Sequence, residues 1–353
     1  VKALRKKGKK ARLLFSWDEF DRLRKVPKNV QEINNDMEKY IIKRILAAIP
    51  MVLIITVICF ALMNLAPYDA IDAMTTPNMS PETVALIKAK YGYDQPVYIQ
   101  YIRWLDGLIN GNFGYSIVTH QSISADLAIR IPNTIKLILP AYLLAYALAI
   151  VLGLIAGSHK NKWVDKLIDG ICAIGIALPT FWVSMLLIYF LGYKLNVLPI
   201  VGMHTIGQEN SMIDYLRHFL MPFIALFLSF LPDATRYVRS STITQYSEDY
   251  VMVQQAFGAS KAEIMFKHVC KNVLLPIITK LGMALPMLVT GAIITETIFG
   301  WPGVGPYFVK AIQGMDYPIV MVILVLSSTL VILGNLLSDI LYCLTDPRIK
   351  DLG

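Results

Sequence analysis

The side chains that most often do chemistry are sparse in this chain and form no recognisable catalytic pattern. Its five histidines lie far apart without an HExxH sequence, and no GxSxG sequence marks a nucleophilic serine. The four cysteines show no CxxC spacing, which argues against a zinc site or a disulfide framework. The GxxxxGK[S/T] loop that cradles phosphates is also missing, so the chain cannot hydrolyse ATP by that chemistry. We therefore expect no enzyme activity, no metal and no cofactor bound by this chain.

One segment does carry a functional pattern: residues 233–272, which are too polar to span a membrane and too apolar for a plain linker. The pattern predicts helix, break, helix. Ser247, Glu248 and Asp249 have the pattern of a cap, and the two acidic residues place negative charge at the amino end of a short helix. Gly258 then interrupts it, because glycine readily adopts the backbone conformation of a sharp turn. Ser260 opens the following helix with an S-x-x-E capping box. A short helix held between two long ones has a shape that can fit into a partner protein.

The elements that must position this segment are predicted to be membrane spans. The 353 residues are 56% hydrophobic and 16% charged, with a mean hydropathy of +0.54, which is too apolar for a soluble enzyme. Apolar runs of about 20 residues can cross about 30 Å of hydrocarbon as helices. The fold class is therefore an all-α polytopic membrane protein. We predict six spans: Ile45–Ala66, Leu137–Ala156, Gly170–Tyr193, Phe219–Pro232 extended at one end, Leu274–Thr295 and Pro318–Ser338.

The distribution of basic residues predicts the orientation. Residues 1–44 hold 14 Lys and Arg against 6 Asp and Glu, so this segment alone accounts for the net charge of +8. If the chain starts inside, the inside segments contain 25 of the 33 Lys and Arg. Because basic residues accumulate on the cytoplasmic side of membranes, both termini are predicted to be cytoplasmic. The positive charge thus indicates topology at a lipid bilayer, and nucleic acid is not an expected partner.

The segments outside the spans complete the expected organisation. Ser16–Glu19 is a second capping box, which predicts a short amphipathic helix suited to an anionic membrane surface in the basic leader. The chain is then divided into a basic cytoplasmic extension (1–40), the first span (41–66), an extracytoplasmic helical segment (67–131), a core of five spans that includes the loop 233–272 (132–343), and a cytoplasmic tail (344–353).

Two short helices are expected in the extracytoplasmic segment. Ser80 and Pro81 mark the start of the first helix, and Tyr91 lies at its end. The second begins near Pro96 and has one apolar face made of Val97, Tyr101, Trp104, Leu105 and Leu108. This segment is either a cap that packs on the outer mouth of the bundle or a docking surface for an extracytoplasmic partner, and the two roles are compatible.

Ordered motifs occur along most of the chain. Within the loop they are Glu248-Asp249-Tyr250-Val251, Gly258-Ala259-Ser260 and Asn272-Val273-Leu274-Leu275-Pro276. Elsewhere they are Leu65-Ala66-Pro67, Tyr91-Gly92-Tyr93-Asp94-Gln95-Pro96, Gly111-Asn112-Phe113-Gly114-Tyr115-Ser116, Arg130-Ile131-Pro132-Asn133-Thr134, Glu296 through Gly305, and Thr345-Asp346-Pro347-Arg348. From about Tyr40 to Leu352, the chain resembles the permease subunits of ATP-binding-cassette peptide importers, of the oligopeptide and dipeptide permease B type. It departs from the wider importer pattern at Met252-Val253-Gln254, where that pattern has Glu-Ala-Ala.

The resemblance implies a type I importer permease fold in a bacterial cytoplasmic (inner) membrane. It also implies a heteromeric complex with a second homologous permease subunit of the C type, two ATP-binding subunits that carry ATP and Mg²⁺, and an extracytoplasmic substrate-binding protein. The substrate would be a peptide, most simply an oligopeptide. In such a complex this chain would form half of the translocation pathway, and its short cytoplasmic helix would couple the pathway to ATP hydrolysis.

Three groups of site residues follow from the resemblance and from the residue types. Those expected to couple to the ATPase are Glu248, Asp249, Tyr250, Met252, Gln255, Ala256, Gly258, Ala259 and Ser260. The small and polar residues expected along the pathway are Pro179, Thr180, Ser184, Pro286, Thr290 and Gly291. Those expected to contact an extracytoplasmic protein are Tyr91, Trp104, Trp301, Pro302 and Gly303.

Alternatives remain open for several of these assignments. Helix packing explains the small residues of the spans as well as a pathway does, and anchoring at the membrane interface is an alternative for Trp301. The same machinery could import dipeptides or nickel. A secondary transporter would need intramembrane ionisable residues or an inverted repeat, and neither pattern is found in the sequence.

Overall fold

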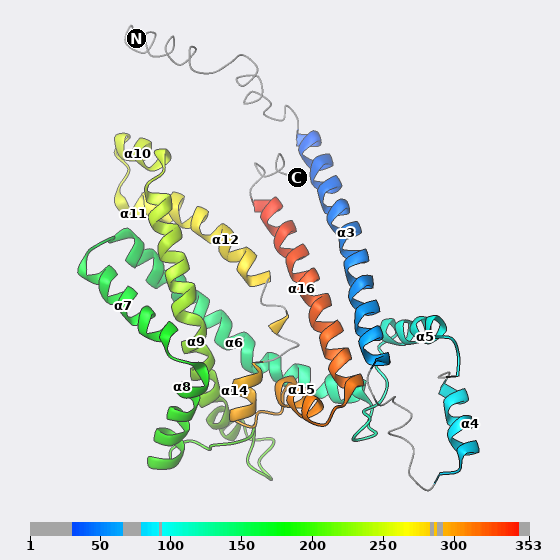
Figure 1. The fold of residues 1–353 in the computed structure, drawn as a ribbon. Helices are drawn as coiled ribbons and strands as arrows, with labels where there is room; N and C mark the ends of the chain where they lie inside the picture. Colours follow the sequence, from blue (N-terminus) through cyan, green and yellow to red (C-terminus); the bar gives the residue numbers. More distant parts are fainter. Residues whose placement is uncertain (1–29, 66–78, 92–93, 283–285, 288–291, 346–353) are drawn as a thin grey trace. The chain divides into compact units, whose positions relative to one another are not determined.

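The computed structural model describes residues 30–65, 79–91, 94–282, 286–287 and 292–345, and most of these residues are helical (Figure 1). The chain divides into two compact units, residues 1–47 with 343–353 and residues 48–342, and every side-chain contact discussed below lies in the second unit. The predicted helix of the leader, near residues 16–26, lies outside the described residues. The all-α prediction agrees with this structure.

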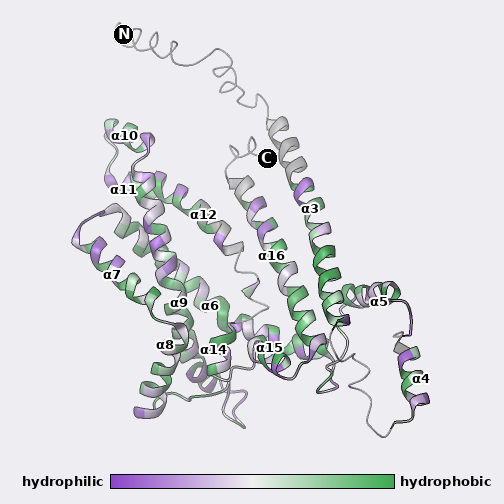
Figure 2. Ribbon diagram, in the orientation of Figure 1, coloured by the Kyte–Doolittle hydropathy of each residue, from purple (hydrophilic) through white to green (hydrophobic). Residues whose placement is uncertain are grey.

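Four long helices are apolar enough to cross a membrane, and they match four of the predicted spans. Their apolar parts are Ile41–Asn64 within α3 (Val30–Asn64), all of α6 (Ile123–Ser158), all of α9 (Met212–Tyr246), and Tyr317–Leu341 within α16 (Tyr317–Thr345). Figure 2 shows hydrophobic residues along α3, α6 and α16. The short uncharged run predicted around Phe219–Pro232 belongs to a 35-residue helix, α9, which is long enough to span.

The third predicted span, Gly170–Tyr193, is not one continuous helix. It consists of α7 (Trp163–Ala177), α8 (Thr180–Leu187) and the π-helical segment η1 (Ile188–Lys194), with a bend of 91° between α7 and α8. The break lies at Leu178 and Pro179, whose ψ angles of 117° and 136° are extended. Proline disfavours helical backbone in the residue before it, which explains the position of the break. The bent pair counts as one span at most, so the described residues hold four or five spans, and the predicted count of six is not reached.

The fifth predicted span, Leu274–Thr295, falls partly outside the described residues. Its first half is part of α12 (Cys270–Gly282), and its last residues belong to α14 (Ile293–Ile298). Residues 283–285 and 288–291 are not described. The prediction of a single span here therefore stays a prediction.

Close packing of α6 on α9 organises the centre of the larger unit. Gly153 and Gly157 of α6 lie one turn apart and face Val238 and Thr242 of α9. A Cβ atom added at Gly153 would lie 2.4 Å from the Val238 Cβ, and one added at Gly157 would lie 2.5 Å from the Thr242 Cβ. Small residues spaced by four bring two helix backbones together, and this contact provides dispersion energy within a membrane. The pair α6 and α9 thus forms the frame to which the shorter helices attach.

The two short helices predicted before α6 are present. α4 covers Pro81–Tyr91, and the Ser80 hydroxyl accepts a hydrogen bond from the Thr83 amide at 3.2 Å, as expected for an N-cap. α5 covers Val97–Ile109. Short helices α14 and α15 (Val304–Gln313) precede α16 and enclose the loop at Trp301.

Candidate functional site

The predicted short helix is α10 (Asp249–Ala256), and its two ends explain its length. At the carboxyl end, Gly258 has φ of +84°, and its amide donates to the Gln255 carbonyl while the Ala259 amide donates to the Gln254 carbonyl. This pair of bonds is a Schellman motif, in which glycine occupies the left-handed position. The prediction that Gly258 interrupts the helix is therefore confirmed.

The amino end of α10 differs from the expectation in one detail. Glu248 is the N-cap residue and Asp249 lies in the first turn, but no side chain donates or accepts a capping hydrogen bond there. Ser247, expected to be part of the cap, instead ends α9 and donates its hydroxyl proton to the Ile243 carbonyl at 3.1 Å. Both acidic side chains are exposed. They place negative charge beside the positive end of the α10 dipole, which is favourable, and remain available to a partner.

One face of α10 packs on the long helices. Val251 is buried in an apolar cluster with Val238 of α9, Ile264 and Val269 of the π-helical segment η2 (Ile264–Val269), and Val273 of α12. Burying a valine side chain contributes about 1.5–3 kcal/mol. This contact holds α10 against α9 and α12 even though the helix has only eight residues.

A polar joint reinforces this attachment. The side-chain oxygen of Gln245, at the end of α9, accepts a hydrogen bond from the Tyr250 hydroxyl at 2.9 Å and another from the Asn272 amide group at 3.1 Å. The Tyr250 ring also lies near the His268 ring in a tilted arrangement, with ring centroids 6.4 Å apart. Burial raises the pKa of the Tyr250 phenol, so the hydroxyl remains a proton donor at neutral pH. Gln245 therefore connects α9, α10 and α12 through a single oxygen atom.

The opposite face of α10 is apolar and is left uncovered by the part of the chain that the structure describes. Met252 is 69% exposed and Phe257 is 85% exposed, and Val253 is exposed beside them. Gln255 and Ala256 are exposed as well. Large apolar side chains that project from a short helix, with two carboxylates at its amino end, form a surface suited to a protein groove.

The helix after α10 begins as predicted. The Ser260 hydroxyl accepts a hydrogen bond from the Glu263 amide at 3.2 Å, which confirms the capping box at the start of α11 (Lys261–Glu263). Lys267 donates to the Glu263 carboxylate at 2.7 Å, and this contact lowers the pKa of Glu263 below its usual value. Ala259, between the two helices, is half-buried and packs against the Val251 cluster.

Ion pairs connect the same part of α9 to its neighbours. The Arg239 guanidinium donates two hydrogen bonds to Asp165 of α7, a carboxylate that is almost fully buried. Arg236 pairs with Asp169 of α7 at 3.2 Å, and Lys280 of α12 pairs with Asp233 at 3.3 Å. These contacts, together with the joint at Gln245, connect α9 to α7, α10 and α12.

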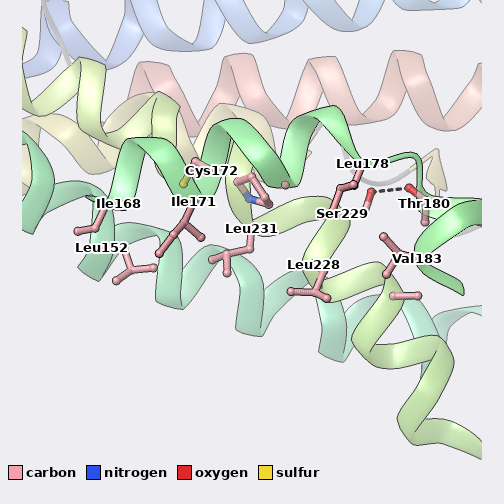
Figure 3. A pocket seen from close by; sticks show the side chains of 13 residues that line it. Leu152, Ile168, Ile171, Cys172, Leu178, Thr180, Val183, Leu228, Ser229 and Leu231 are labelled. Carbon is pink, nitrogen blue, oxygen red and sulfur yellow. Dashed lines mark hydrogen bonds between the residues drawn. The ribbon is translucent and has the colours of Figure 1, made fainter. Parts of the chain in front are cut away.

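The residues expected along the pathway are not gathered into one site among the described residues. Pro179 forms the α7–α8 break, and Thr180 lines an apolar pocket of about 200 Å³ with residues of α6, α7 and α9 (Figure 3). The hydroxyl groups of Thr180 and Ser229 lie 3.0 Å apart at one end of this pocket. Ser184 is buried and donates its hydroxyl proton to the Thr180 carbonyl, so it is not among the lining residues. Pro286 is half-buried, whereas Thr290 and Gly291 lie outside the described residues.

The residues expected to contact an extracytoplasmic protein differ in their surroundings. Trp301 is fully buried against the rings of Tyr215 and Phe219, and its indole nitrogen donates to the Asn133 carbonyl at 2.9 Å. Gly303 is buried too, whereas Pro302 is exposed. The chain itself encloses both the Trp301 ring and Gly303. In this conformation neither residue is accessible to another protein or to the membrane interface.

The two remaining residues of that group lie on the short helices. Trp104 of α5 is half-buried against Phe60 of α3, with ring centroids 5.5 Å apart. Tyr91 is the last residue of α4, and its side chain lies outside the described residues. The expected contact of these two residues with another protein stays a prediction.

Hydrogen bonds beneath the Trp301 loop attach it to α6 and α14. The Gly305 amide donates to the Glu296 carboxylate at 2.7 Å, and the Val304 amide donates to the Thr134 hydroxyl at 2.9 Å. A Cβ atom on Gly303 would lie 2.4 Å from that carboxylate and 2.5 Å from the Thr134 hydroxyl. The glycine is thus required by the close approach of the loop to α6.

Sequence reasoning did not select Gln245, Val253 and Phe257 as site residues. Val253 and Phe257 belong to the apolar positions of the short helix, but their exposure depends on which face of α10 packs on α9. Gln245 lies 27 positions before Asn272, and nothing in its local sequence indicates that the two side chains meet. Within the described part of the chain, no group of three or more His, Cys, Asp or Glu side chains is placed to hold a metal ion.

Comparison with known proteins assigns the chain to a family. The protein-family model described as "Binding-protein-dependent transport system inner membrane component" matches residues 149–351. A second family model, described as "Binding-prot-dependent transport system membrane comp, N-term", matches residues 37–138. Residues 1–55 also match a model described as "tRNA synthetases class I (K)". That segment consists of the basic leader and the start of the first apolar helix, so we infer no activity from this match.

The chain aligns with several curated relatives over almost their whole lengths. The chain is 36% identical to the oligopeptide transport system permease protein AppB of Bacillus subtilis, over 89% of this chain and 100% of the relative. It is 32% identical to a putative peptide permease protein of Brucella suis, over 89% of this chain and 99% of that protein. It is 31% identical to the glutathione transport system permease protein GsiC of Escherichia coli K12, over the same shares. These matches confirm the resemblance found in the sequence motifs: the chain belongs to the family of binding-protein-dependent transport system inner membrane components.

Proposed function

We propose that this chain is the permease subunit of an ATP-driven peptide importer and that α10 couples it to a separate ATPase subunit. The family supports a transport role, and the relatives described as peptide permeases support the substrate class. The observation that carries the coupling role is the two-sided character of α10. Its buried face joins α9 and α12 through Val251 and Tyr250, while its other face presents Met252 and Phe257 to solvent.

Coupling requires a helix that is both held by the permease and accessible to the motor. Displacement of α10 by an ATPase that closes on ATP would act on α9 through Gln245, and on α7 through the pair of Arg239 with Asp165. The Glu248 and Asp249 carboxylates would face basic groups of the ATPase. In this arrangement α10 and both termini are cytoplasmic, and the partners are two ATP-binding subunits with ATP and Mg²⁺, a second permease subunit and an extracytoplasmic binding protein.

A charge introduced on the exposed face of α10 tests the coupling role. Burial of a phenylalanine side chain contributes about 1.5–3 kcal/mol, so a Phe257→Asp change should weaken ATPase binding about 10- to 100-fold. Phe266→Asp is the matched control, because Phe266 is also an exposed phenylalanine but lies beyond α10, on η2. The measurements are the amount of ATPase subunit that co-purifies and the substrate-stimulated ATP hydrolysis in reconstituted complexes. Equal retention of ATPase and coupling in both variants would overturn the coupling role of α10.

Uptake assays test the substrate class. Labelled pentapeptide, dipeptide, glutathione and Ni²⁺ should be offered to vesicles that contain the complex, and we expect saturable, ATP-dependent uptake of the pentapeptide. Relatives named for oligopeptide and for glutathione transport make glutathione the second candidate. Uptake of glutathione or Ni²⁺ without any uptake of peptide would contradict the oligopeptide assignment while leaving the permease role intact.

We place part of the pathway at the α7–α8 break. This position supplies the hydroxyl groups of Thr180 and Ser229 beside an otherwise apolar pocket of about 200 Å³, a volume that suits a single side chain. Thr180→Cys should react with a small water-soluble thiol reagent, and transported peptide should slow that reaction. Ser184→Cys is the control, because Ser184 is buried and does not line the pocket. Reaction at position 180 that is indifferent to substrate would argue for simple helix packing.

A further inference from the structure

α5 carries two apolar faces, and only one of them is covered by the described residues of the chain. The inner face packs on α3 and α16: the Tyr101 hydroxyl lies 2.9 Å from the Thr56 hydroxyl, Trp104 packs on Phe60, and Leu108 joins the cluster of Cys59, Met321 and Val325. The outer face consists of Tyr98, Ile102 and Ile109, which are 66%, 60% and 75% exposed. At about 100° per residue, these three positions lie within about 40° of one another around the helix. They form one continuous stripe, which we call the outer stripe.

The contacts of the inner face determine how deep α5 lies along the membrane spans. Phe60 and Thr56 lie four and eight residues before the end of α3 at Asn64. At 1.5 Å per residue this is about 6 and 12 Å from the end of the helix. Met321 and Val325 lie four and eight residues after the start of α16 at Tyr317, which is again about 6 and 12 Å. Two independent spans thus give the same depth for the contacts of α5.

This depth corresponds to the edge of the hydrocarbon. The apolar part of α3 has 24 residues and the apolar part of α16 has 25, so each is about 36 Å long against a hydrocarbon thickness of about 30 Å. If each span is centred, its last 3 Å or so lie in the headgroup region, and the contacts with α5 fall about 3 and 9 Å inside the boundary of the acyl chains. A helix at that depth meets lipid rather than bulk water on any side that the protein does not cover.

The composition around the outer stripe agrees with lipid as its occupant. The exposed residues Ile58 and Leu62 of α3 lie at similar levels to the contacts of α5 within an apolar span, so the outer stripe and the span are both apolar at this depth. Tyr98 has the amphipathic ring that is enriched at membrane interfaces. The charged residues Arg103 and Asp106 are exposed beside the outer stripe, on the side of α5 away from its inner face. There they can reach headgroups or water.

We propose that α5 is an interfacial helix whose outer stripe, Tyr98, Ile102 and Ile109, inserts into the membrane at the boundary between headgroups and acyl chains. Such helices bury their apolar face about 5–10 Å into this boundary. The helix thereby fixes the end of α3 against α16 at one membrane surface. The inference rests on the membrane location of the spans and not on the identity of the substrate or on the role of α10.

Spin-label accessibility in the full-length chain tests this proposal. Single changes Tyr98→Cys, Ile102→Cys and Ile109→Cys are made in a background in which the four native cysteines are replaced, and each variant is labelled and placed in phosphatidylcholine–phosphatidylglycerol vesicles. Arg103→Cys on the polar side of α5 and Glu82→Cys on α4 are matched exposed controls. The measurement compares collision with oxygen, which concentrates in lipid, and with a water-soluble nickel chelate.

At the three stripe positions we expect oxygen accessibility to exceed that of the nickel chelate, with depths of about 5–10 Å below the headgroups. The two controls should show the reverse order. Chelate accessibility at the stripe equal to that at Glu82 would overturn the proposal and favour a surface open to the aqueous phase. Low accessibility to both reagents would also overturn it, because it would mean that another protein subunit covers the stripe. Three separate positions protect the result against one label that perturbs the helix.

Discussion

Replacement of Gln245 by leucine is the sharpest test of the joint between α9, α10 and α12. Leucine has a similar volume but no acceptor, so Gln245→Leu removes the bonds from Tyr250 at 2.9 Å and from Asn272 at 3.1 Å. A hydrogen bond contributes about 1 kcal/mol net, so the joint loses about 2 kcal/mol, which corresponds to a factor of about 30 in an equilibrium. We therefore expect transport per ATP hydrolysed to fall several-fold and by at most about 30-fold.

Folding and ATPase binding should change little in this variant. The Val251 cluster continues to hold α10, and Met252 and Phe257 still face outward. Gln245→Glu is the matched control, because its carboxylate keeps an oxygen that can accept both hydrogen bonds. Tyr250→Phe and Asn272→Leu each remove one bond and should each produce about half of the energetic effect, without further loss when combined with Gln245→Leu.

The assay is simultaneous measurement of peptide uptake and phosphate release in vesicles that contain the assembled complex. Wild-type transport per ATP in Gln245→Leu, with normal assembly, would refute the role of this joint in coupling. A Gln245→Glu variant as defective as Gln245→Leu would show that the shape of the side chain, and not its acceptor atom, is what matters. Loss of ATPase co-purification would instead mean that α10 itself had been displaced.

Two further predictions concern stability and are measured by thermal unfolding in detergent. Gly303→Ala should destabilise the chain by about 1–3 kcal/mol, because the new Cβ would meet the Glu296 carboxylate and the Thr134 hydroxyl. Gly170→Ala is the control and should be neutral or stabilising, since a Cβ there meets nothing within 4 Å. Equal effects of the two changes would contradict the close approach of the loop to α6. Asp165→Asn should lower the free energy of unfolding by about 3 kcal/mol, because it leaves the Arg239 guanidinium without its buried partner. Asp169→Asn should lower it by about 1 kcal/mol or less, since the side chains of Asp169 and Arg236 are 35% and 49% exposed. A smaller loss in Asp165→Asn than in Asp169→Asn would refute this ranking.

Local sequence determined the features whose physics is local. The apolar runs predicted α3, α6, α9 and α16, because a membrane selects helices by the length of uncharged sequence. Ser260 and Gly258 marked the ends of helices, because capping and left-handed backbone depend on the residues at those positions. The acidic residues at its amino end and Gly258 at its carboxyl end likewise predicted the short helix between α9 and α11.

Tertiary structure decided which faces of these elements are covered. The Trp301 ring has the amphipathic character of a residue at the membrane interface, yet contacts from Asn133 and Phe219, at least 82 positions away in the chain, enclose it. The exposure of Phe257 and the meeting of Gln245 with Asn272 depend on how α10 lies against α9 and α12. Burial and side-chain pairing are properties of surfaces assembled from distant segments, so periodicity and hydropathy can propose that a helix exists but cannot say which of its faces remains free to bind a partner.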